Sequence, residues 1–315
     1  MSEATLETAP PTKLPLPERL RRNPVLLKEL RSRMRGSRAF ILITIYLGLL
    51  SLLVGGVYLV FVLSEPTTYN ISQQQVFGKT IFGLVVWVEL LLVSFVAPAL
   101  TSGAISSERE HQTYDLLRTT LLPARSLVLG KFSSGLVFIL LLLFAGLPLQ
   151  SLAFLFGGVA SSEFVIATLL LVVTAIAFCA TGVFFSSFLS RTLVSTVLSY
   201  AFAILLVFGL PMLMVVVASM VGQMLGTMQP SIDTITEIFL LVLGYLAVAV
   251  NPLATAIATE VLLLDQQTAF LWIYPLPNGP TLYVISPWIP YVIFYLAVSL
   301  ILLWVSVRRV RRVEK

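Results

Sequence analysis

Six stretches of this chain are apolar for long enough to cross a lipid bilayer, and no other feature of the sequence constrains its fold as much. A helix needs about 20 apolar residues in a row to span the hydrocarbon core. The first stretch, 39–63, reads AFILITIYLGLLSLLVGGVYLVFVL. The others lie at about 81–103, 132–156, 164–189, 193–219 and 287–307. We therefore predict an all-α integral membrane protein with six transmembrane helices.

The composition excludes the water-soluble classes. Of the 315 residues, 58% are hydrophobic and only 11% are charged, whereas soluble domains carry about 25% charged residues. The polar residues are too few to cover a soluble surface, so a soluble enzyme, a disordered protein and a disulfide scaffold are all excluded. A β-barrel is disfavoured, because its strands alternate in polarity over about 10 residues. The single cysteine, Cys179, lies in an apolar run and is expected to pack as a small hydrophobic side chain.

The N-terminal region has two parts. Residues 1–22 are polar and proline-rich, which indicates a disordered cytosolic tail. Residues 23–38 begin with Asn23 as a helix cap and Pro24 at the first helical position, and they predict an amphipathic interfacial helix. An ordinary cytosolic helix is the alternative, but direct continuation into the first span argues against it. The proposed membrane-facing residues are Leu26, Leu27, Leu30 and Met34, and the headgroup-facing residues are Lys28, Arg31 and Arg35.

The lysine and arginine residues predict the topology. Nineteen of the 20 fall in 1–38, 104–131, Arg191 and the basic tail 308–315, and Lys79 is the exception. With six crossings, all nineteen lie on one side, as the positive-inside rule requires. We therefore expect a multi-pass protein of the plasma membrane with both termini, the loop 104–131 and the tail 308–315 in the cytoplasm.

The segment 220–286 is the hardest to assign. It holds apolar residues, which would suggest one further span, but a seventh crossing would place the basic tail outside the cell. We therefore predict an external segment whose residues 236–260 form a re-entrant or surface-lying helix pair, broken at Asn251 and Pro252. A pair of short spans within 236–264 also keeps the charges correct and remains an alternative.

No catalytic or cofactor-binding motif is found in the sequence. The single histidine, His111, stands in a charged loop, and no residues have the spacing of a metal site. A GKT string occurs at 78–80, but a phosphate-binding loop needs a glycine five residues earlier, where Gln73 stands. We therefore expect no catalytic, cofactor-binding or metal-binding residue in this chain, which is not predicted to be an enzyme.

Glu89 is the one acidic residue well inside a predicted span. Ionisable side chains at that depth are costly and point to function by default. The other reading is a carboxyl group that is protonated or paired with a polar neighbour, and the remaining spans offer Ser, Thr, Tyr and Asn for this purpose. Glu89 is therefore an intramembrane polar candidate.

The loop after the second span carries the most specific pattern. It reads GAISSEREHQTYDLLRTTLLPARSLVLGK from Gly103, with alternating charges followed by leucines at helical spacing. This pattern predicts a short amphipathic helix on the cytosolic face. Such a helix either docks in a groove of another protein or lies solvated against the headgroups.

At this loop the chain resembles the permease subunits of ABC-2 type ATP-binding-cassette transporters. The matching residues are Gly103 to Glu110, Thr113, Asp115, Leu116, Leu117, Thr119, Thr120 and Gly130-Lys131. The segment NPVLLKELRSRMRGSRAF is similar to the sequence that precedes the first span in the same family. The resemblance covers about 20–130 and the last span well, and 220–286 only loosely.

The resemblance implies a six-span permease of an ATP-driven transporter, and it favours export as the direction of transport. A separate ATP-binding subunit would hydrolyse ATP and contact the interfacial helix and the 104–122 loop. A second copy, or a sister permease, would complete a dimeric pathway; no nucleic acid is expected as a partner. The residues implied in coupling to the ATPase are Glu108, Arg109, Glu110, Thr113, Asp115, Leu116 and Leu117.

Two other classes of function remain open. A secondary carrier would show inverted repeats with broken helices in both halves, and only one broken segment is visible here. A membrane scaffold or assembly factor would have the same topology but would leave the loop motif unexplained.

Overall fold

The computed structural model describes most of the membrane-embedded part of the chain. The described residues are 26, 28–31, 37–64, 71–112, 123–227, 234–266, 268–275 and 281–313. Within them, six helical stretches are long and apolar enough to cross a membrane. Nearly all described residues are helical, which confirms the prediction of an all-α integral membrane protein.

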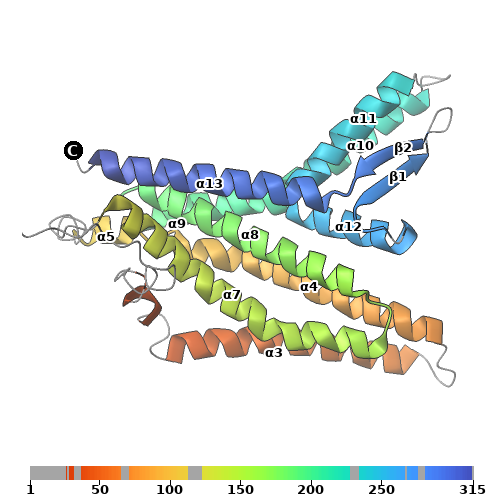
Figure 1. The fold of residues 1–315 in the computed structure, drawn as a ribbon, viewed down its shortest axis with the longest axis horizontal. Helices are drawn as coiled ribbons and strands as arrows, with labels where there is room; N and C mark the ends of the chain where they lie inside the picture. The colour runs from red at the N-terminus through yellow and green to blue at the C-terminus, as the bar shows by residue number, and fades with distance from the viewer. Residues whose placement is uncertain are drawn as a thin grey trace, which may run out of the picture.

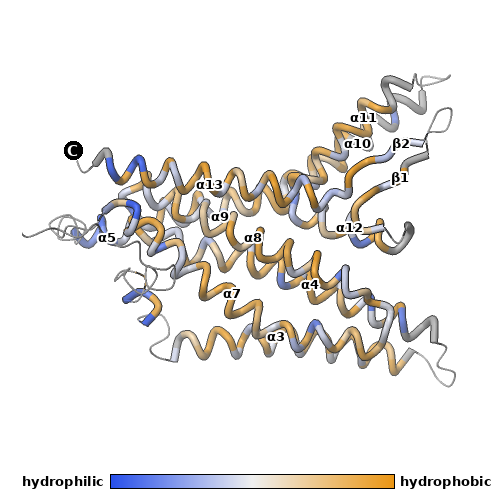
Figure 2. Tube along the Cα trace, viewed as in Figure 1, coloured by the Kyte–Doolittle hydropathy of each residue, from blue (hydrophilic) through white to orange (hydrophobic). Residues whose placement is uncertain are grey.

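Most of the long helices lie side by side along one axis of the molecule (Figure 1). In chain order the long helices are α3 (Ser37–Ser64), α4 (Ile71–Thr101), α7 (Ala124–Phe156), α8 (Ser161–Phe188), α9 (Thr192–Ile204), the π-helix η1 (Leu205–Gly209), α10 (Leu210–Thr227) and α13 (Trp288–Val313). Helix α10 departs from the common axis at an angle (Figure 1). Apolar residues dominate their length, and hydrophilic ones gather mainly near the ends (Figure 2). The C-terminus and the short helix α5 (Ser106–Glu110) lie at the same end of the bundle.

Two helices begin earlier than the sequence predicts. The second span is expected from 81 but α4 begins at Ile71, and the third is expected from 132 but α7 begins at Ala124. The extra turns contain glutamines, lysines, serines and an arginine. These side chains lower the mean hydropathy without stopping a helix, so the apolar signal starts late. The part of the predicted 104–131 loop after Ala124 is therefore the first turns of α7.

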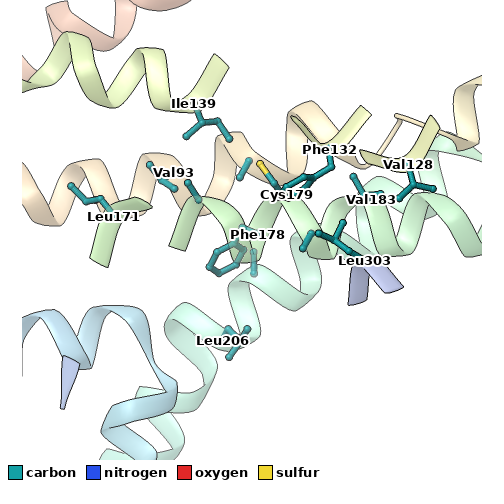
Figure 3. Close-up of a cluster of buried hydrophobic side chains, with 14 of the residues drawn as sticks. Val93, Val128, Phe132, Ile139, Leu171, Phe178, Cys179, Val183, Leu206 and Leu303 are labelled. Atoms are coloured by element: carbon teal, nitrogen blue, oxygen red, sulfur yellow. The ribbon is translucent and has the colours of Figure 1, made fainter. Parts of the chain in front are cut away.

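Helix α8 forms the centre of the bundle. In its most apolar window 67% of the residues are buried, against 17% in α3 and 11% in the α9–α10 stretch. Its side chains Phe178, Cys179 and Val183 pack with residues of α4, α7, η1 and α13 in the largest apolar cluster (Figure 3). Cys179 is fully buried in this cluster, as the sequence leads one to expect.

The segment before the last helix contains a sharply bent helix pair and a hairpin. The chain bends by 114° between helices α11 (Thr234–Val250) and α12 (Pro252–Gln266). Strands β1 (Leu271–Pro275) and β2 (Thr281–Ile285) then pair antiparallel. The bend lies at the predicted break beside Pro252, whereas the hairpin was expected only as part of an external segment.

Asn251 holds the bend in place. Its Oδ1 accepts the N–H of Ala254 at 2.8 Å, which is the bond of a helix cap on α12. Its amide Nδ2 donates to the carbonyl oxygens of Leu206 and Val207 in the π-helix. The bent pair is thereby fixed to the point where the α9–α10 stretch departs from regular α-helix.

Candidate functional site

Helix α5 follows α4 after a break in the helix at 102–105. One side chain of α8 holds the start of this short helix: Ser186 Oγ accepts the backbone N–H groups of Ile105 at 2.8 Å and of Ser106 at 2.9 Å. Backbone donors at a helix N-terminus otherwise lack intrahelical partners. The contact with Ser186 therefore fixes the position of α5 against the bundle.

A buried lysine connects α5 to the N-terminal segment. Lys131, near the start of α7, has only 7% of its side chain exposed. Its Nζ lies 2.6 Å from Glu29 Oε1 and 2.9 Å from Glu108 Oε1. A buried ammonium group needs such partners, because losing its hydration is expensive. Lys131 therefore ties together the N-terminal helical segment, α5 and the third span.

The second carboxylate of α5 binds a different helix. Glu110 Oε2 accepts the backbone N–H of Thr192 at 3.0 Å and its hydroxyl at 2.6 Å. Thr192 is the first residue of α9, so the negative charge stands at a helix N-terminus, where the backbone dipoles favour an anion. We call the set of Glu29, Glu108, Glu110, Lys131 and Thr192 the α5 junction.

The structure brings part of the predicted coupling site together. Glu108, Arg109 and Glu110 lie on α5, and the first and last of them make the contacts just described. Between residues 104 and 112 the loop is helical over α5, and it is helical again from Ala124, where α7 begins. Predicted coupling residues that lie outside the described part are Thr113, Asp115, Leu116 and Leu117.

Of the predicted interfacial helix, the structure describes residues 26 and 28–31, all of which are helical. Lys28 and Arg31 are exposed, Leu26 is buried and Leu30 is half-buried, in keeping with two unlike faces. The predicted residues that lie outside the described part are Leu27, Met34 and Arg35.

Lys131 and Glu29 were not predicted as site residues from the sequence. In the sequence, Lys131 appears as the last residue of the motif that resembles the family. Glu29 appears within the predicted amphipathic helix. A signal was present, because Lys131 is the one charged residue among the apolar residues from 127 to 156. Such a lysine needs an acidic partner, although the sequence does not say which carboxylate supplies it.

A second polar cluster lies inside the bundle around Glu89, which is fully buried. Tyr46 Oη of α3 donates to Glu89 Oε1 at 3.0 Å, and Gln150 Nε2 of α7 donates to Glu89 Oε2. Gly146 leaves the room that this cluster occupies, because a methyl group there would collide with the Glu89 carboxylate. Tyr46 is one of the predicted partner types, whereas Gln150 was missed. The carboxyl group joins α3, α4 and α7.

The described residues contain no group of three or more His, Cys, Asp or Glu side chains able to hold a metal ion. His111 is exposed at the end of α5. The chemistry found in the described part of the bundle is therefore hydrogen bonding and ion pairing.

These features define a polytopic helical membrane protein with a cluster of charged contacts, the α5 junction, at one end of the bundle. Residues 24–306 match the family described as ABC-2 family transporter protein, and the chain belongs to this family. It is a permease, the membrane component of an ABC transporter, and such permeases associate with an ATP-binding subunit and do not themselves catalyse hydrolysis. A comparison with individual curated proteins finds no match.

Proposed function

We propose that this permease works in an exporter and receives movement from a separate ATP-binding subunit at the α5 junction. The observation that carries the proposal is the position of Lys131, whose ammonium group contacts Glu29 and Glu108 together. The interfacial helix and the first loop, both implied as ATPase contacts by the sequence resemblance, thereby share one buried charge. The direction of export rests on that resemblance.

The contacts of α5 suggest how movement would spread. The short helix follows α4 in the chain, contacts α7 through Lys131, and contacts α9 through the bond from Thr192 to Glu110. A push on α5 would therefore act on three membrane-spanning stretches at once. Interactions that join elements in this way can transmit a conformational change without any chemistry in the permease.

The proposal includes an orientation and an assembly. The termini and the α5 junction would face the cytoplasm of a plasma membrane, because the lysines and arginines gather there. A second copy or a sister permease would complete the pathway. Helix α3 and the α9–α10 stretch have the least buried apolar windows, so they offer surface for lipid or for that second subunit.

Charge reversal at the junction tests the proposal. In Glu108→Arg an arginine would face Lys131 and repel it, and we expect co-purification of the cognate ATPase, or permease-stimulated ATP hydrolysis, to fall by about tenfold or more. The permease should still insert and elute as a folded protein. Adding Lys131→Glu restores opposite charges and should recover part of the activity.

Gln75→Arg serves as a matched control, since Gln75 is exposed at the opposite end of α4. It adds the same side chain and should leave ATPase association unchanged. If Glu108→Arg retains both full ATPase association and full stimulated hydrolysis, the α5 junction is not the coupling site.

A further inference from the structure

A pocket lies at the end of the bundle opposite α5, between α4, α8 and α12. Its walls include two aromatic side chains, Phe82 and Trp87, and two carboxylates, Glu163 and Glu260. Thr259 also lines it. No residue of the α5 junction lines this pocket, so a ligand could bind here whether or not an ATP-binding subunit couples at that junction.

The charges around this pocket do not cancel. Lys79 Nζ lies 3.6 Å from Glu163 Oε1, and this pair is neutral. Glu260 makes no hydrogen bond or ion pair within the described part of the chain. With both carboxylates ionised, the three charged groups would together carry one net negative charge, which a bound ligand with one positive charge would neutralise.

An unpaired hydroxyl group gives independent support for a ligand. Thr259 is 3% exposed, and its Oγ1 has no hydrogen-bond partner among the residues that the structure describes. Buried polar atoms in folded proteins nearly always have a partner, from protein, water or ligand. The Thr259 hydroxyl lines the same pocket as the unpaired Glu260, and both are oxygen acceptors.

Gly83 explains how a carboxylate fits so close to α4. A methyl group at this position would lie 2.7 Å from Glu260 Oε1, which is closer than real contacts allow. The lack of a side chain at Gly83 therefore lets the Glu260 carboxylate lie against the helix backbone, one turn from Lys79 and beside the pocket.

We propose that this pocket binds a primary ammonium group carried on an apolar molecule. An ammonium group brings one positive charge and three N–H donors, for which Glu163, Glu260 and Thr259 offer oxygen acceptors. The rings of Phe82 and Trp87 suit both a cation and an alkyl chain. Ca²⁺ or Mg²⁺ would require about six oxygen ligands, and a wall this rich in apolar side chains supplies too few.

The test uses the full-length permease purified in dodecyl maltoside micelles, with hexylammonium chloride as probe and hexanol as neutral control. Isothermal titration calorimetry should show saturable binding of hexylammonium only. Glu260→Gln and Glu163→Gln should each weaken binding by about tenfold or more, because each removes a charge-assisted hydrogen bond. Glu110→Gln, at the opposite end of the bundle, is the matched control and should bind normally.

Two further variants separate ligand binding from damage to the fold. Thr259→Val keeps the shape and breaks no hydrogen bond to a described residue. A loss of about threefold to tenfold in affinity would therefore report the contact with the ligand. Lys79→Met changes the net charge of the cluster from −1 to −2 and should tighten binding about fivefold.

Equal affinity in the parent protein and Glu260→Gln overturns the proposal, as does the absence of saturable binding. Binding that appears only in Lys79→Met also overturns it, because Lys79 would then be the natural cation of the pocket. Adding phosphatidylethanolamine, with phosphatidylcholine as control, identifies the source of the amine. Competition by phosphatidylethanolamine supports a lipid headgroup, and lack of competition supports a free amine at the same site.

Discussion

Two of the helix breaks in the described part of the chain, between α4 and α5 and between α11 and α12, are held in different ways. Between α4 and α5, side chains from other helices satisfy the backbone: Ser186 accepts two N–H groups, and Ser195 donates to the Ser102 carbonyl at 2.6 Å. Between α11 and α12, the residue at the break itself, Asn251, makes most of the bonds. Backbone groups freed in a membrane protein need partners in either case, since lipid offers none.

The surroundings of the two breaks differ as well. The first leads into the charged α5 junction, where Glu108 is still partly exposed to solvent. The second is buried among apolar residues, and Tyr295 Oη of α13 adds a bond of 2.6 Å to the Val250 carbonyl. The first break depends on serines of other helices. The second, which we call the self-held break, carries its own cap at Asn251 and is fixed further by bonds to η1 and α13. We infer that the first can transmit motion and that the second is a rigid part of the scaffold.

The largest effect is expected at the self-held break. Asn251→Leu removes the cap of α12 and leaves two buried carbonyl groups without their donor, so the free energy of unfolding should fall by about 3 kcal/mol. Chemical unfolding of the purified permease in micelles measures this change. Asn251→Asp keeps the acceptor for Ala254 but cannot donate to η1, and it should show an intermediate loss. Unchanged stability in Asn251→Leu would mean that packing alone sets the bend.

At the break between α4 and α5 we expect a smaller loss of stability, together with a loss of coupling to the ATPase. Ser186→Ala leaves the N–H groups of Ile105 and Ser106 without their acceptor, at a cost of about 2 kcal/mol. Hydrogen exchange at these two amides should quicken, and association with the ATPase should weaken. Ser187→Ala is the matched control, because among the described residues Ser187 bonds within its own helix, to the Phe184 carbonyl. Equal exchange rates in the two variants would contradict the role given to Ser186.

The smallest effect is expected for the single hydrogen bond from Tyr295 to Val250, which supplements the self-held break. Tyr295→Phe removes the hydroxyl that reaches Val250 and should lower the free energy of unfolding by about 1 kcal/mol. Tyr283→Phe, which removes the same group from an exposed strand residue, should have almost no effect. If Tyr295→Phe also impairs ATPase coupling, the contrast between a transmitting and a rigid break is wrong.

Several features of the fold could be predicted because their causes are local. The apolar stretches marked the membrane-spanning helices, and the Asn-Pro pair marked the bend at 251–252, since both rest on properties of neighbouring residues. Helix starts such as Ile71 and Ala124 were missed, because polar residues at a helix end hide the apolar signal without ending the helix.

Reading the residues in order was enough to recognise a multi-span permease of the ABC-2 family with a charged loop after its second span. The tertiary structure alone decides which charged and polar side chains contact one another. Glu29 and Lys131 are far apart in the chain, Glu110 reaches Thr192, and Gln150 rather than a serine or asparagine binds Glu89. Pairings of this kind depend on how helices rotate and pack against one another. That arrangement is set by the sum of many apolar contacts across the bundle, and no single stretch of sequence contains it.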